Sequence, residues 1–267
     1  MSTVRRDQLV VTAAAVLWVV GTLIGTGLVG AGGGVEEQGD GLFSDAATLI
    51  APDGPAFSIW SVIYLFLAGY VVWQWLPHTR DSVWASRTRL PAAASLALNG
   101  IWLLVVFAGW VFVSVLVIAA IAASLGVILR RAAGLPDEGW WPRILVSVTF
   151  GLYLGWICVA TCANVALWLV DLGVPAEGQL ATAVTVVVLV VVLALVVVLL
   201  RRADRVLGTA LVAAVAWGVA WVAVGRLSGE PASDVVGYAA VATAVLVVAA
   251  WGVRVLAARN PGHRVAR

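Results

Sequence analysis

The chain has 267 residues, of which 63% are hydrophobic and 11% are charged, with a formal net charge of +2. Its mean hydropathy is +1.05. A water-soluble domain needs a polar surface that this composition cannot supply. Several apolar runs reach the ~20 residues that cross a ~30 Å hydrocarbon core, and they are too long for barrel strands. The composition therefore predicts an all-α polytopic membrane protein.

The first apolar run covers residues 9–29 and follows a pair of arginines. It is longer than the ~7–15-residue core of a signal peptide, so we predict a retained helix rather than a cleaved leader. Gly21 and Gly25 are four residues apart, which is typical of closely packed membrane helices. The glycines at residues 30–34 lack the following Lys-Ser or Lys-Thr of a phosphate-binding loop.

The second to fourth spans follow an acidic loop at residues 35–54 that contains no basic residue. Pro55 begins the second span, because proline is tolerated in the first turn of a helix. Residues 90–129 form one uncharged run. As a single helix this run would extend ~60 Å, about twice the thickness of the hydrocarbon core. We therefore predict two helices joined by a tight turn at residues 108–110.

The fifth span begins at Trp140 and ends at Val170. Three further apolar spans follow, at residues 180–200, 206–225 and 235–253. The sequence thus predicts eight transmembrane helices.

The distribution of charge supports this topology. With both termini in the cytoplasm, Arg226 is the only arginine on the outer side, and most acidic residues lie outside. This bias agrees with the positive-inside rule, so we expect a multi-pass protein of the inner or plasma membrane with cytoplasmic termini. Arg226 and Arg254 lie near the ends of their spans, where we expect them to extend toward the membrane interface.

The polar residues exclude several kinds of chemistry. No Asp, Glu or His lies within a span, and His78 and His263 both fall in cytoplasmic segments. Proton pumps, hydrolases and metalloenzymes need ionisable, nucleophilic or clustered ligand residues that these spans lack. Cys158 and Cys162 lie four apart in one apolar helix, and we interpret them as packing residues. A non-enzymatic function is therefore favoured.

Most of the tryptophans fit belts at the two membrane interfaces. The predicted inner belt contains Trp73, Trp75, Trp84, Trp140, Trp141 and Trp251, and the outer belt contains Trp110 and Trp168.

Aromatic and amide side chains recur at helical spacing deeper in three spans. In the fifth span, Tyr153, Trp156, Ala160 and Asn164 are three or four residues apart and share one face. Asn99 lies in the third span. Each amide either joins neighbouring helices or, together with aromatic walls, lines a cavity for a flat apolar ligand.

Three segments, in this order, resemble the tryptophan-rich sensory protein family, which includes the TspO and peripheral benzodiazepine receptor relatives. They are FSIWSVIY from Phe57, LALNGIWLLVVF around Asn99, and YLGWICVATCAN from Tyr153. The resemblance covers about residues 9–171. One departure is that Phe57 precedes Trp60 by three positions, where the family pattern has four.

The resemblance implies a five-helix transmembrane bundle in residues 1–171, followed by three additional transmembrane helices and a basic cytoplasmic tail in residues 172–267. Members of the family bind porphyrins and other flat hydrophobic ligands between their helices, and they often dimerise. The resemblance implies a pocket lined by Phe57, Trp60, Tyr64, Asn99, Trp102, Tyr153, Trp156, Ala160 and Asn164.

These features together predict a membrane receptor or sensor for a tetrapyrrole-like ligand. Haem needs an axial ligand and no His lies at depth, so a metal-free porphyrin such as protoporphyrin IX is the expected ligand. The alternatives are a transporter or facilitator of a small apolar solute, and a Trp-dependent porphyrin-degrading enzyme. The expected partners are the lipid bilayer, the small hydrophobic ligand and a second copy of the chain, with no nucleic acid.

Overall fold

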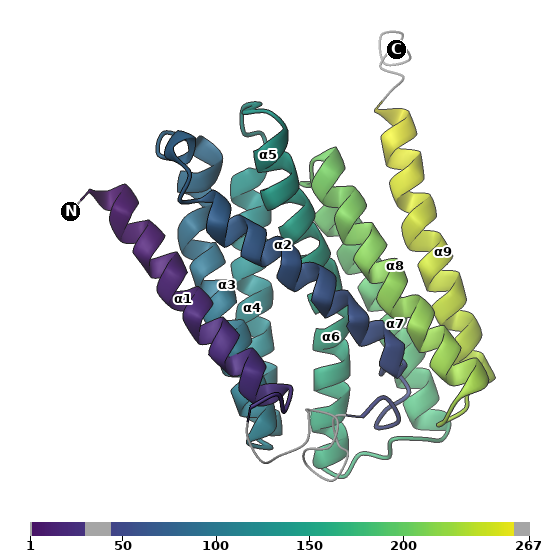
Figure 1. Ribbon diagram of the computed structural model, residues 1–267. Coiled ribbons are helices and arrows are strands. Elements are labelled where there is room, and N and C mark those ends of the chain that lie inside the picture. Colours follow the sequence, from purple (N-terminus) through teal and green to yellow (C-terminus); the bar gives the residue numbers. More distant parts are fainter. Residues whose placement is uncertain (1, 30–43, 259–267) are drawn as a thin grey trace, which may run out of the picture.

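A computed structural model describes residues 2–29 and 44–258 of the chain. Within these ranges every regular element is a helix (Figure 1). This follows from the apolar composition, because a backbone in hydrocarbon has to satisfy its own hydrogen bonds. The glycines at residues 30–34, part of the acidic loop, His263 and the last three arginines lie outside the described residues.

The long helices are α1 (Thr3–Gly25), α2 (Ile59–Trp73), α3 (Val83–Phe107), α4 (Val111–Ala132), α6 (Thr149–Asp171), α7 (Gln179–Leu200), α8 (Arg205–Ser228) and α9 (Asp234–Ala257). The short elements are the 3₁₀ turns η2 (Gly54–Ser58) and η3 (Pro77–Thr79), the single turn α5 (Trp140–Pro142) and the π-helical η4 (Arg143–Val148).

Eight helices among the described residues are long and apolar enough to cross a membrane, which confirms the predicted number of spans. The second of them continues from η2 into α2, and the fifth continues through α5, η4 and α6. Helix α1 begins and α9 ends at the same end of the molecule (Figure 1). We call this end the terminal end and the opposite one the loop end.

The predicted turn between the third and fourth spans is confirmed. Helix α3 ends at Phe107 and α4 begins at Val111. Gly109 between them has φ +72°, a left-handed conformation that glycine adopts without steric cost. The two helices therefore form a tight antiparallel hairpin.

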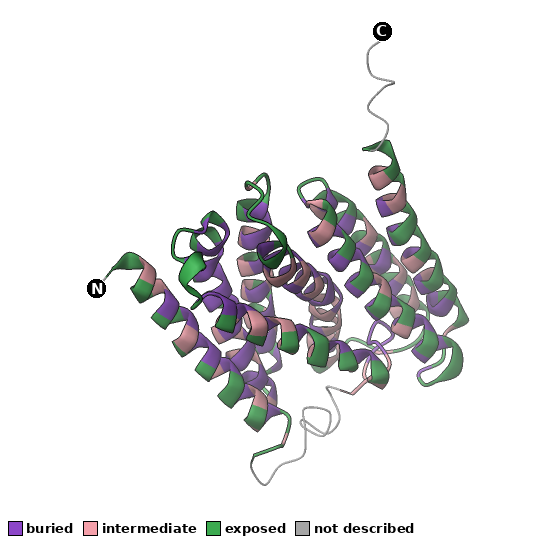
Figure 2. Ribbon diagram, turned by 45° about the horizontal axis from the view of Figure 1, so that its top comes forward, coloured by how far each residue is buried: buried purple, intermediate pink, exposed green. Residues whose placement is uncertain are grey.

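The helices stand in a curved row, and α2 crosses it obliquely (Figure 1). Along the row, α1 packs on α3, α3 on α4, α4 on α6, α6 on α8, and α8 on α9, which also contacts α7. The spans that contain α6 and α8 have the largest share of buried residues, and those of α7 and α9 have the smallest (Figure 2). The core therefore centres on α6 and its neighbours.

Glycines allow the closest helix contacts. The prediction for the first span is confirmed, because a side chain at Gly21 would overlap the backbone of Gly100 on α3. Gly151 and Gly155 of α6 meet the carbonyls of Leu207 and Leu211 on α8 in the same way. The backbone of α8 is thus held directly against the fifth span.

The predicted tryptophan belts are wrong for three residues. Trp73, Trp84 and Trp251 are buried within the protein rather than placed at its lipid-facing surface. The indole N–H of Trp84 donates to the carbonyl of Pro136 at 2.8 Å, and that of Trp251 to the Thr209 hydroxyl at 3.1 Å. These indoles join segments of the protein at the terminal end.

Candidate functional site

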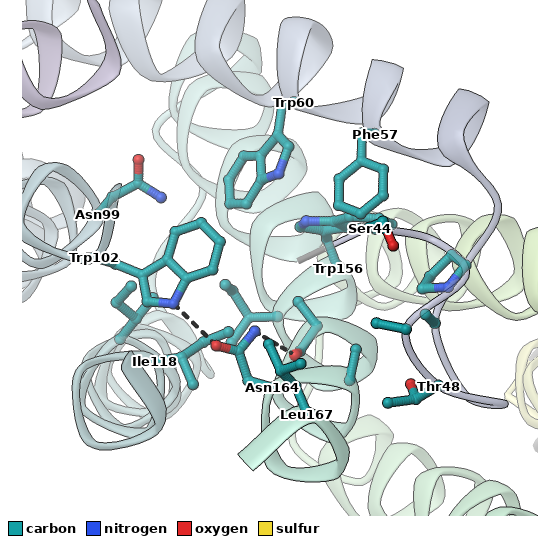
Figure 3. A pocket seen from close by; sticks show the side chains of 17 residues that line it. Ser44, Thr48, Phe57, Trp60, Asn99, Trp102, Ile118, Trp156, Asn164 and Leu167 are labelled. Carbon is teal, nitrogen blue, oxygen red and sulfur yellow. Dashed lines mark hydrogen bonds between the residues drawn. The ribbon is translucent and has the colours of Figure 1, made fainter. Parts of the chain in front are cut away.

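A cavity of about 70 Å³ lies at the loop end, enclosed by α2, α3, α4, α6 and the segment of residues 44–52 (Figure 3). Within each helix, most of the predicted residues face the cavity together, because residues three or four apart share a face. Their role in ligand binding remains a prediction. The cavity is lined by seven of the nine residues predicted to bind a ligand: Phe57, Trp60, Asn99, Trp102, Trp156, Ala160 and Asn164.

Aromatic rings form one wall of the cavity. The ring of Trp156 lies edge-on to Phe57, with centroids 5.6 Å apart and an interplanar angle of 79°. It also lies edge-on to Trp60, at 6.1 Å and 80°. Edge-to-face pairs of this kind are favoured by the ring quadrupoles and contribute about 0.5–1.5 kcal/mol each beyond their buried area. These contacts fix the orientation of the wall.

Asn164 joins three helices at the bottom of the cavity. Its side-chain oxygen accepts hydrogen bonds from the Trp102 indole at 3.3 Å and from the Ser114 hydroxyl at 3.0 Å. Its amide nitrogen donates to the Ala160 carbonyl at 3.1 Å (Figure 3). The sequence left open whether this amide joins helices or lines a cavity, and in the structure it does both.

Two N–H donors at the cavity have no partner. The oxygen of Asn99 accepts the Tyr64 hydroxyl at 3.0 Å, but its buried amide nitrogen has no partner among the described residues. The indole nitrogen of Trp156 is likewise buried and unpaired. In Figure 3 both nitrogens point toward the space between Trp60 and Trp102. The cavity thus offers hydrogen-bond donors that nothing in the described protein uses.

The two remaining predicted residues, Tyr64 and Tyr153, lie behind the lining. Tyr64 packs against Trp60 at a centroid distance of 5.2 Å. Tyr153 meets the other side of Trp60 at 5.8 Å, and its hydroxyl donates to the Ser95 carbonyl at 3.4 Å. Both tyrosines therefore support the aromatic wall.

A short segment closes the cavity, and sequence reasoning missed it. We call residues 44–52 the cover. The segment belongs to the acidic loop, but the cover residues that line the cavity are small and uncharged, so no sequence motif marks them. The cover contributes Ser44, Ala47, Thr48, Ala51 and Pro52.

Comparison with protein families identifies the chain. A family model described as TSPO-like protein matches residues 9–253. This chain belongs to the TSPO-like protein family. Comparisons with curated proteins and with solved structures find no match. The family match extends beyond residue 171 into α9, so in this TSPO-like protein the last three helices belong to the family pattern.

Arg226 on α8 holds the cover, and its predicted position was wrong. The side chain does not extend to the interface, because Arg226 is only 1% exposed. Its guanidinium donates to the carbonyls of Thr48 at 3.2 Å, Asp45 at 3.3 Å and Glu230 at 3.3 Å. A buried guanidinium is stabilised by several such bonds, since its desolvation is costly. The charge therefore ties the cover to α8.

Two further contacts fix the start of the second span on α8. The backbone N–H of Asp53 donates to the Trp221 carbonyl at 3.3 Å. The indole of Trp217 donates to the Ala56 carbonyl at 2.9 Å. In this TSPO-like protein, α8 thus positions both the cover and the beginning of the helix that carries Phe57 and Trp60.

The lining is suited to binding. Among the described residues, no charged side chain lines the cavity, and no group of three or more His, Cys, Asp or Glu side chains is placed to hold a metal ion. Aromatic faces and amide or indole N–H groups contribute stacking and hydrogen bonds. The cavity thus combines an apolar surface with a few directed donors.

Proposed function

We propose that this TSPO-like membrane protein is a receptor or sensor that binds a flat hydrophobic ligand in the cavity between α2, α3, α4 and α6. The observation that carries the proposal is the pair of unpaired donors on Asn99 and Trp156, which face an aromatic cavity. An unsatisfied buried donor costs about 1–3 kcal/mol, so a ligand that accepts both hydrogen bonds removes this penalty.

The same chemistry defines the ligand class. The ligand has an extended apolar face for the rings of Trp60 and Trp156, together with acceptor atoms for the two N–H groups. A metal-free porphyrin has both features, because its macrocycle is flat and apolar and its carboxylate side chains carry acceptor oxygens. None of the described lining residues is His, Cys, Met or Tyr, the side chains that commonly ligate haem iron, which favours the metal-free macrocycle.

A ligand of this size requires the cavity to expand. At about 70 Å³ the cavity is far smaller than the ~300–1,000 Å³ typical of small-molecule sites. The cover is not a helix: it is held by hydrogen bonds from the Arg226 guanidinium to its backbone carbonyls and by the buried side chains of Leu49 and Ile50, so it can move without breaking helical hydrogen bonds. Ligand binding is therefore expected to displace the cover.

Titration of the purified protein with protoporphyrin IX, followed by porphyrin fluorescence, tests the proposal. The wild type should show saturable binding. Combining Asn99→Leu with Trp156→Phe should weaken it about five- to 150-fold, because each of the two lost hydrogen bonds contributes about 0.5–1.5 kcal/mol. Trp140→Phe, at an exposed site on the terminal end, is the matched control and should leave the affinity unchanged. Non-saturable binding, or equal affinity in all three proteins, would refute the proposed function.

The proposal also includes the orientation of the protein in the membrane. Among the described arginines, Arg226 is the only one at the loop end, and the positive-inside rule then assigns the terminal end to the cytoplasm. Fusions of alkaline phosphatase and green fluorescent protein to the C-terminus test this assignment. Only the fluorescent fusion should be active, and an active phosphatase fusion would reverse the orientation.

A further inference from the structure

A second pocket lies at the terminal end, where α3 begins and α4 ends. It is a groove of about 410 Å³. Three of its described lining residues are arginines, namely Arg87 on α3 and Arg130 and Arg131 in the last turn of α4. This groove is at the opposite end of the molecule from the aromatic cavity, and the proposed function does not use it.

The three positive charges have no acidic partner among the described residues. No carboxylate lines the groove. The carboxylates of the following loop are engaged elsewhere: Asp137 pairs with Arg143 at 2.9 Å, and Glu138 accepts hydrogen bonds from the backbone of Val83 and the hydroxyl of Ser82. Like charges gathered in one groove repel each other, and a bound anion would relieve this repulsion.

The groove also has a defined geometry. One guanidinium nitrogen of Arg131 donates to the backbone carbonyl of Arg87 at 3.3 Å, which joins the end of α4 to the beginning of α3. A guanidinium carries five N–H donors in a rigid planar fork, so most of the donors remain for a ligand. This fork matches the two oxygens of a phosphate group better than a lysine ammonium does.

The position of the groove indicates the source of the phosphate. Both helices are long and apolar enough to cross a membrane, with Arg87 near the beginning of α3 and Arg130 and Arg131 in the last turn of α4. Arginines near the ends of spans extend toward the interface, so we expect these guanidinium groups at the level of the lipid headgroups. Val127 and Leu135 line the groove beside the arginines and provide an apolar surface for the part of a lipid next to its headgroup. Basic pockets between transmembrane helices commonly bind anionic headgroups.

We propose that Arg87, Arg130 and Arg131 form a binding site for the phosphodiester of an anionic phospholipid. The lipid binds with its headgroup phosphate between the three guanidinium groups and its acyl chains along the outer faces of α3 and α4. The site is independent of the proposed ligand cavity and does not depend on its function.

A lipid competition experiment on the full-length protein tests the site. The protein is reconstituted in nanodiscs of phosphatidylcholine with a small fraction of labelled phosphatidylglycerol, and retention of the labelled lipid is measured after detergent extraction. A variant that combines Arg87→Gln, Arg130→Gln and Arg131→Gln should retain about tenfold less phosphatidylglycerol than the wild type.

The chain offers a matched control for this loss of charge. Three other exposed arginines lie at the terminal end: Arg201 and Arg202 in the turn after α7, and Arg205 at the start of α8. Their combined change to Gln removes the same charge and should alter retention less than twofold. An equal loss in both triple variants would show general attraction of the lipid to basic residues and would overturn the proposal.

Two further measurements complete the test. A variant that combines Arg87→Lys, Arg130→Lys and Arg131→Lys keeps the charge but should still retain about threefold less lipid, because an ammonium cannot form the paired contact. Retention equal to that of the wild type would contradict the guanidinium site. Adding inorganic phosphate to millimolar concentration should not displace the labelled lipid. Displacement would make free phosphate, rather than a lipid, the ligand of the groove.

Discussion

Asn164 shows how one side chain can serve both the fold and the site. Its oxygen accepts hydrogen bonds from α3 and α4, while the residue itself lines the cavity from α6. An unpaired amide in hydrocarbon costs several kcal/mol, so an amide at this depth needs partners from neighbouring helices. The spacing in the sequence predicted which face Asn164 occupies, but not that Ser114 would be one of its partners.

Replacing Asn164 with leucine should destabilise the bundle. Among the described residues, the Trp102 indole then has no acceptor, whereas the Ser114 hydroxyl keeps the Val111 carbonyl. We expect a loss of about 1–2 kcal/mol in the free energy of unfolding, since hydrogen bonds between membrane helices contribute about 0.6–2 kcal/mol. Unfolding in SDS measures this loss. Ser114→Ala is the control and should cost less, because Asn164 then keeps the indole; a larger cost for Ser114→Ala would contradict this account.

The buried position of Arg226 could not be predicted from the sequence. An arginine near the end of an apolar span normally extends to the interface, and nothing in the sequence distinguishes Arg226 from Arg254 in this respect. The difference comes from backbone carbonyls of the cover and of the loop after α8, which carry no side-chain signature. Partners of this kind become visible only once the fold is known.

Changing Arg226 to glutamine should loosen the cover. The carbonyls of Asp45 and Thr48 lose their charged donor, and each such hydrogen bond contributes about 1.5–3 kcal/mol. Hydrogen–deuterium exchange of residues 44–53 should accelerate at least tenfold while exchange in α4 stays unchanged. Arg254→Gln on α9, whose guanidinium bonds to the Arg201 carbonyl, is the control and should leave the cover protected. Unchanged exchange in the Arg226 variant would show that Arg226 does not hold the cover in place.

At the scale of helices, hydropathy and proline or glycine signals predicted the spans well. The long apolar runs, the turn at Gly109 and the proline at the start of the second span all appear where the sequence indicated. Two local features were not predicted. The π-helical turn η4 and the 3₁₀ form of η2 both contact α8, and hydropathy does not distinguish either turn from a regular α-helix.

The contact between α6 and α8 depends on Gly155. A Cβ at this position would overlap the backbone carbonyl of Leu211. Gly155→Ala should therefore separate the two helices and destabilise the protein by about 1–3 kcal/mol, as overpacked cores generally do. The matched control is Gly126→Ala on α4, where an added Cβ would meet nothing within 4 Å.

Gly126→Ala should instead be neutral or stabilising, because alanine is favoured over glycine in a helix by about 0.5–1 kcal/mol. The two thermal midpoints, measured under the same conditions, provide the comparison. Equal midpoints for the two variants would mean that α6 and α8 do not need this close approach.

For the whole molecule, the family match and the packing agree that the last three helices belong with the first five. The match covers residues 9–253, and α8 supplies the contacts that hold the cover. The resemblance inferred from sequence motifs covers only residues up to about 171, because the recognisable motifs lie on the spans that line the cavity. Helices that support a site through backbone contacts need not carry such motifs.

Ligand binding should stabilise the whole bundle. A ligand that binds only the folded state raises stability by about 2.7 kcal/mol at a concentration one hundred times its Kd. Protoporphyrin IX at that concentration should raise the thermal midpoint of the wild type by several degrees. The combined Asn99→Leu and Trp156→Phe variant should show a much smaller shift. An equal shift in both proteins would indicate that the porphyrin stabilises them from another site.

The hydrogen bonds of Arg226 also have a consequence for biosynthesis. The helices that wall the cavity are complete once residue 171 has left the ribosome, but the residue that fastens the cover is synthesised only near the end of α8. Until α8 is inserted in the membrane, the nascent protein has the residues of the aromatic wall but lacks Arg226, which holds the cover. For the proposed ligand, this order of synthesis predicts that access to the cavity is easiest before α8 is inserted.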